Sequence, residues 1–99
     1  MRMDISFSQR VISQPYTMVN DLGGEAVMLN LKSACYYGLD KTGSRMWAVL
    51  TGSESIQAAY EALLSEFDVE PERLRRDLIG LIEKLVEHEL VAIERVGLS

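Results

Sequence analysis

The sequence predicts an α+β fold in which a three-stranded antiparallel sheet is followed by three helices. Two features support this prediction. Apolar and polar residues alternate in part of the region before Asp40, as they do in half-buried strands. After Asp40 the apolar residues recur every three or four positions, which is typical of amphipathic helices. We expect residues 1–99 to form a single domain with an ordered core of about residues 10–92.

Three short stretches are expected to form the sheet. Residues 16–19 are rich in strand-forming types, and the turn residues at 21–24 follow them. Residues 26–31 alternate between apolar and polar faces, and a connection of hairpin length leads to the third strand at residues 35–39. Because this third strand is the last, one of its edges would keep unpaired backbone groups.

Three helices and a final short strand are expected after the sheet. Asp40 can cap the first helix, and Trp47 should anchor its apolar face in the core. Pro71 suits the first position of the third helix, which we expect to reach about Leu90, with a strand at residues 91–96 after it. The second helix is predicted from one apolar stripe: Ile56, Ala59, Tyr60, Leu63, Leu64 and Phe67.

The third helix has an apolar stripe that is wider than a core requires. Four leucines at residues 74–85 make an ordinary core stripe. A shoulder consisting of Ile79, Ile82 and Val86 widens it to roughly 160°, where a core-facing helix needs roughly 100°. Arg75 points the same way as this shoulder. Either the shoulder faces a second apolar neighbour, or the sheet or the first helix covers it.

The sequence lacks the residue patterns of the common catalytic and metal sites. Cys35 is the only cysteine and is expected to pack rather than to react. His88, the only histidine, lies among charged residues and is expected on the surface. Neither a zinc ligand set nor a phosphate-binding loop is visible. We therefore expect a protein that is not an enzyme and that uses neither a metal nor a cofactor.

Composition and charge indicate where the protein is located and which classes of partner are unsuitable. The N-terminus lacks the apolar run of a signal peptide, and no apolar stretch approaches the roughly 18 residues of a membrane span. A cytoplasmic protein without a membrane partner is expected. Residues 51–99 carry five basic and eleven acidic side chains. This acidic half would repel phosphate backbones, so nucleic acid is a poor partner.

An ordered set of motifs lies within about residues 10–92: Val27-Met28-Leu29-Asn30-Leu31, Tyr36-Tyr37-Gly38-Leu39-Asp40, Gly43, Met46-Trp47, Phe67-Asp68-Val69, Asp77, Leu81, Leu85 and Leu90-Val91. This set resembles the PqqD-like proteins. The run from Tyr36 through Gly43 to Trp47 looks more like the stand-alone members of lasso-peptide clusters than those that serve pyrroloquinoline quinone synthesis.

The resemblance implies a winged-helix-like fold and a non-catalytic recognition role. Such a protein binds the leader segment of a ribosomally synthesised precursor peptide and presents it to a partner protease or other modifying enzyme. The leader would add as a strand to the open edge and lie against the third helix. The implied peptide-binding residues are Cys35, Tyr36, Tyr37 and Gly38 on the edge, and Arg75, Ile79, Ile82 and Val86 on the helix.

Two alternatives remain open at the level of sequence. The open edge could pair with a second copy of the chain, which would give a homodimer. A winged-helix nucleic-acid-binding regulator is the alternative function, with the third helix as its recognition element. Residues 71–90 carry four basic and five acidic side chains, however, and such a helix is poorly suited to bind phosphate.

Overall fold

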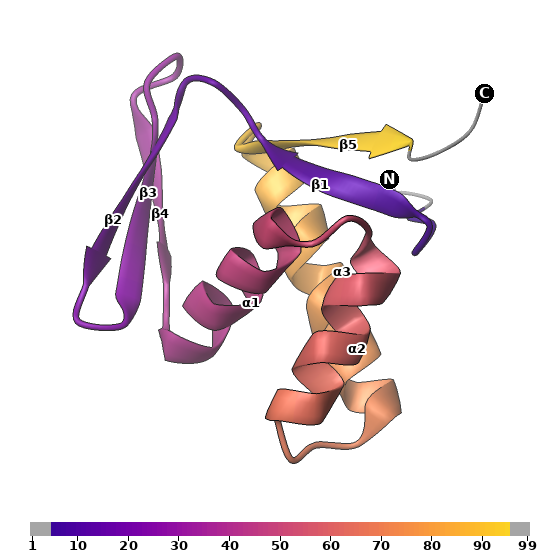
Figure 1. Cartoon of the computed structure of the whole chain (residues 1–99). Coiled ribbons are helices and arrows are strands. Elements are labelled where there is room, and N and C mark those ends of the chain that lie inside the picture. Colours follow the sequence, from indigo (N-terminus) through magenta and orange to yellow (C-terminus); the bar gives the residue numbers. More distant parts are fainter. Residues whose placement is uncertain (1–4, 96–99) are drawn as a thin grey trace.

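The computed structural model describes residues 5–95 of the chain. Its elements, in order, are β1 (Gln9–Ser13), β2 (Thr17–Leu22), β3 (Glu25–Asn30), β4 (Cys35–Leu39), α1 (Lys41–Gly52), α2 (Ile56–Glu66), α3 (Pro71–Glu87) and β5 (Val91–Arg95). The predicted α+β fold, a three-stranded antiparallel sheet followed by three helices, is confirmed. The sheet has the order β2-β3-β4 and stands to one side of the helices (Figure 1).

A second sheet, which the sequence analysis did not predict, joins the two ends of the described chain. β1 pairs with β5 in antiparallel register from Gln9 opposite Arg95 to Ser13 opposite Val91. β1 was missed because five residues carry a weak pattern and its partner lies at the other end of the sequence. The short final strand was expected at residues 91–96 and is observed at Val91–Arg95.

Local signals in the sequence start the helices where they were expected. The Asp40 carboxylate caps α1 by accepting a hydrogen bond from the backbone N–H of Gly43 at 2.8 Å. The Ser55 hydroxyl caps α2 in the same way, with the N–H of Ala58 at 3.1 Å. Pro71 occupies the first turn of α3.

The end of α3 differs from the prediction by about one turn. The helix ends at Glu87 rather than at about Leu90. Glu89 adopts a left-handed backbone conformation with φ of 58°. Its N–H donates to the carbonyl of Val86 at 2.9 Å, and the N–H of Leu90 donates to the carbonyl of Leu85 at 2.9 Å. This is a Schellman motif that forms without the usual glycine, and for that reason no stop signal is visible in the sequence.

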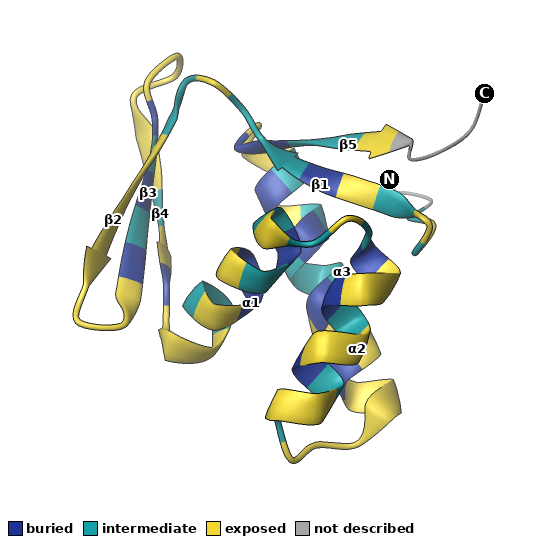
Figure 2. Ribbon diagram, in the orientation of Figure 1, coloured by how far each residue is buried: buried dark blue, intermediate teal, exposed yellow. Residues whose placement is uncertain are grey.

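The core lies where the helices meet the inner face of the large sheet and the β1–β5 pair (Figure 2). Trp47 is 9% exposed, so its predicted place in the core is confirmed. On β3 the buried side chains alternate, with Ala26, Met28 and Asn30 facing inward. Opposite pairing places Leu39 and Tyr37 of β4 on this same inner face. The buried residues of α3 are Leu74, Leu78, Ile82 and Leu85.

Gly80 in the middle of α3 offers a prediction about stability. A Cβ atom added at Gly80 would meet no atom within 4 Å. Glycine costs a helix interior about 0.8–1 kcal/mol relative to alanine. We expect Gly80→Ala to raise the free energy of unfolding by about 1 kcal/mol in a urea titration. Gly23 has the same empty surroundings but a φ of +71°, so Gly23→Ala should lower stability; a gain in both variants would contradict this explanation.

Candidate peptide-binding site

β4 is an edge strand whose outer side is unpaired in the described part of the chain. The hydrogen bond from the Leu31 N–H to the Tyr16 carbonyl, at 2.9 Å, fixes which way the backbone groups point. Alternate residues of β3 bond alternately to β2 and to β4. Asn30 and Met28 therefore bond toward β4, and their partners bond inward. Tyr36 and Gly38, the remaining residues of the strand interior, direct their N–H and C=O groups to the free edge.

The two faces of β4 differ in what they offer to a ligand. Tyr36 points to the outer face of the sheet and is 77% exposed. Tyr37 points inward and is half-buried, with its ring centroid 5.0 Å from that of His88 at the end of α3. Cys35 lies on the same face as Tyr37 but is exposed. Cys35 was expected to pack rather than to react, but its side chain is exposed because this end of β4 projects beyond the core.

The two sides of α3 face different neighbours. Taking Leu78 as the centre of the buried stripe and about 100° per residue, Leu81 and His88 fall on one side, about 60–80° from it. The contact between His88 and Tyr37 shows that this side looks toward β4. Lys84 lies on the same side, about 120° from Leu78, and we call the residues Leu81, Lys84 and His88 the facing flank of α3. We call the surface between the edge of β4 and the facing flank the candidate groove.

The predicted helix residues are not on the facing flank. Arg75, Ile79 and Val86 fall about 60–100° to the other side of Leu78. The Arg75 guanidinium carbon lies 4.4 Å from the ring centroid of Phe7, in the segment that precedes β1. Phe7 also contacts Tyr60 of α2 with ring centroids 5.6 Å apart. The structure thus brings Cys35, Tyr36, Tyr37 and Gly38 together on one strand, but it places Arg75 against Phe7, and helical geometry puts Ile79 and Val86 on the same side of α3 as Arg75.

Ile82 requires a further correction. Its side chain is 0% exposed and belongs to the core line of α3. A peptide could not reach it without opening the core. Replacing Ile82 with a charged residue would therefore test folding rather than binding. The buried residues of α3 include Ile82 in place of Leu81. The helix is therefore rotated about its axis relative to the expected core stripe, and Leu81 is half-buried at the edge of the buried stripe.

The facing flank was missed because the sequence does not specify how a helix rotates. Leu81 was assigned to the core stripe and His88 to the free surface. His88 is exposed, yet its ring packs against Tyr37. Lys84 is also exposed, with its Nζ 3.9 Å from the Glu87 carboxylate. The available signal was the excess width of the stripe, which indicated a second neighbour but not on which side.

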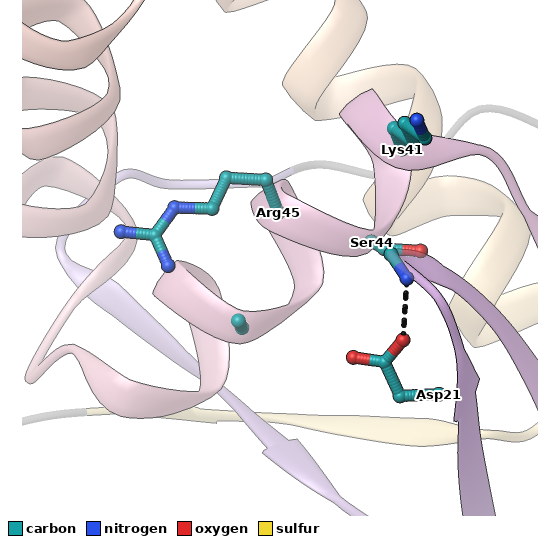
Figure 3. A pocket seen from close by; sticks show the side chains of 6 residues that line it. Asp21, Lys41, Ser44 and Arg45 are labelled. Carbon is teal, nitrogen blue, oxygen red and sulfur yellow. Dashed lines mark hydrogen bonds between the residues drawn. The ribbon is translucent and has the colours of Figure 1, made fainter.

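A separate pocket of about 320 Å3 lies between the β2–β3 turn and α1 (Figure 3). Two of its charged groups already have partners within the chain. Asp21 accepts a hydrogen bond from the N–H of Gly24 at 2.8 Å. Arg45 donates two hydrogen bonds to Glu66, at 2.7 and 2.8 Å, which lower the pKa of Glu66. These charges are engaged in structural contacts, so the edge of β4 is the stronger candidate site.

Within residues 5–95, no group of three or more His, Cys, Asp or Glu side chains is arranged to hold a metal ion. The Cys35 thiol makes its hydrogen bond to the Ser33 carbonyl, at 3.8 Å. No helix in this part of the chain combines the length and the apolar character needed to cross a membrane.

A protein-family model matches the part of the chain that contains the edge strand β4. Residues 25–91 match the family model described as coenzyme PQQ synthesis protein D. The match includes β3, β4 and all three helices. The chain belongs to the PqqD family. No curated protein sequence is significantly similar to this PqqD-family chain.

Two solved structures resemble the PqqD-family chain over most of its length. One is described as TbiB1 in complex with the TbiA(beta) leader peptide; it has a TM-score of 0.75 and 26% identity, and the match covers 89% of this chain and 98% of that chain. The other is described as lasso peptide synthetase B1 complexed with the leader peptide; it has a TM-score of 0.72 and 25% identity, with 86% and 98% covered. Both similar proteins were solved with a leader peptide.

Proposed function

We propose that this PqqD-family chain binds the leader segment of a ribosomally synthesised precursor peptide, in a lasso-type pathway, and presents it to a partner protease or other modifying enzyme. The observation that carries the proposal is the free edge of β4. Tyr36 and Gly38 turn backbone donors and acceptors outward there, and no lysine, proline or charged residue in β4 discourages pairing. The leader peptides bound to the two similar proteins support the same ligand class.

In this mechanism the leader adds as a fourth strand beside β4. Its backbone pairs with the edge, and its inward-pointing side chains lie near the facing flank of α3. The half-buried Leu81 offers apolar contact there, and the Tyr37–His88 pair provides an aromatic wall. Binding holds the rest of the precursor close to a partner enzyme and so raises its effective concentration. The chain itself performs no chemical step.

Modification of Cys35 tests where the peptide binds. Cys35 is the only cysteine and is exposed on the inward face of β4. A bulky maleimide adduct on Cys35 should obstruct the groove at its entrance. We expect the modified protein to bind a labelled synthetic leader at least tenfold more weakly, which corresponds to about 1.4 kcal/mol. The leader is taken from the precursor peptide encoded nearest to this chain's gene, and binding is followed by fluorescence anisotropy.

The matched control is Cys35→Ser treated with the same reagent, which should bind like the untreated parent. If the modified parent binds as tightly as the control, the leader does not pass Cys35. If the untreated parent binds no leader at all, the proposed function itself fails.

The free edge could also pair with the β4 edge of a second copy. A homodimer of this kind would compete with the leader for the same backbone groups. Sedimentation velocity with and without the leader distinguishes the two cases. Under this proposal, any dimer formed by the parent should dissociate as the leader is added. A dimer that keeps its mass at saturating leader would have to use another surface.

A further inference from the structure

Asn30 at the end of β3 is the one polar side chain that is buried among residues 5–94, with 1% exposed. A buried amide is costly unless its hydrogen bonds are made. Its Nδ2 donates to the carbonyls of His88, at 3.1 Å, and Glu89, at 3.4 Å. Its Oδ1 accepts from the N–H groups of Lys32, at 2.9 Å, and Ser33, at 3.1 Å. The amide is therefore satisfied on both sides, and only this orientation matches donors with acceptors.

These bonds join the two borders of the candidate groove at one end. Lys32 and Ser33 lie in the turn that leads into β4, and His88 and Glu89 lie at the end of α3. The backbone is strained near both sets of hydrogen-bond partners of Asn30, at the residue after Ser33 and at Glu89 itself. Ala34 has a φ of 61° and Glu89 a φ of 58°, and they are the two non-glycine residues with positive φ in the described chain. The Ala34 N–H also donates to the Asn30 carbonyl, at 2.8 Å.

We propose that Asn30 is a positioning residue for peptide binding. It fixes the separation and the register between the start of β4 and the end of α3, and it thereby places Tyr37 against His88. A peptide strand that pairs with β4 and contacts the facing flank needs both borders at a set distance. This inference rests on the proposed function, and it adds a residue that the peptide itself does not touch.

Thr17 provides a matched comparison. Its Oγ1 donates to the carbonyl of Leu90 at 2.9 Å, so it too ties the large sheet to the segment that follows α3. Thr17, however, lies on β2, the strand at the far side of the sheet from the free edge. Loss of the Thr17 bond should loosen the segment after α3 without releasing the turn that begins β4. The two residues therefore separate general stability from groove geometry.

The test compares Asn30→Asp with Thr17→Val. Aspartate keeps the shape and the acceptors for Lys32 and Ser33, but it places an oxygen against the carbonyls of His88 and Glu89. We expect Asn30→Asp to bind the labelled leader at least tenfold more weakly, and Thr17→Val to stay within threefold of the parent. Nuclear Overhauser contacts between the Tyr37 and His88 rings should disappear in the first variant and persist in the second, without any peptide present.

A second variant keeps the test decisive if Asn30→Asp unfolds. Glycine adopts the left-handed conformation of residue 89 without strain. Asn30→Asp combined with Glu89→Gly should therefore recover stability without restoring the fixed separation between the start of β4 and the end of α3. A folded variant of Asn30 that keeps both the leader affinity and the ring contact would overturn the proposal. So would an equal loss of affinity in Thr17→Val. If the parent binds no leader, the ring contact alone still decides whether Asn30 positions the two borders.

Discussion

Gly38→Pro should reduce leader binding at least tenfold, which corresponds to about 1.4 kcal/mol or more. The Gly38 N–H points to the free edge of β4, so proline removes a donor that the added strand would use. The pyrrolidine ring would also occupy the space in which that strand lies. The bonds from β4 to β3 are made by the neighbouring residues, so the sheet should survive. Anisotropy titration of the labelled leader measures the loss, and circular dichroism melting checks the fold.

Gly38→Ala is the control for this substitution. A Cβ at Gly38 would meet nothing within 4 Å, and alanine keeps the N–H. We expect Gly38→Ala to bind the leader as the parent does. If Gly38→Pro is folded and binds equally well, the peptide does not pair with β4, and the strand-addition mechanism is wrong.

Trp47→Ala should destabilise the fold strongly, with an expected loss of about 3–5 kcal/mol in the free energy of unfolding. Trp47 lies on α1 among the buried residues of the core and is 9% exposed. Small domains have a total stability of about 5–15 kcal/mol, so the variant should be close to unfolding at ambient temperature. Urea unfolding followed by far-ultraviolet circular dichroism measures this, because Trp47 is the only tryptophan and its fluorescence is lost.

The neighbouring residue supplies the control for the Trp47 prediction. Ala48 is on the same helix but exposed, and Ala48→Ser should change stability by no more than about 0.5 kcal/mol. A Trp47→Ala protein that melts within a degree or two of the parent would mean that the indole does not contribute to the core.

Local signals in the sequence were sufficient for most of the fold. Asp40, Ser55 and Pro71 lie at the starts of the helices because each of them satisfies or tolerates the free N–H groups of a first turn. The last position of β4 in the expected meander also indicated the open edge, and β4 is indeed an edge strand of the observed sheet. Features of this kind depend on neighbours in the chain, and such neighbours are visible in the sequence.

The remaining features depend on distant contacts. The apolar stripe of α3 is wide enough to allow several rotations, and packing into the core cluster, of which Met28 and Trp47 are also members, selects the one that buries Ile82. The stripe alone could not show that Arg75 would meet Phe7. Asn30 was visible only as one residue of a family motif, since its partners His88 and Glu89 are far along the chain.

The pairing of β1 with β5 has a consequence for how the chain folds. The large sheet is built from two consecutive hairpins. In contrast, the pairing of β1 with β5 closes a loop that contains most of the described chain. Closing a long loop loses more chain entropy than closing a hairpin, so contacts at high sequence separation tend to slow folding. We expect the β1–β5 pair to form after the hairpins and the helices. Substitutions in Val11 or Ile93 should then speed unfolding far more than they slow folding.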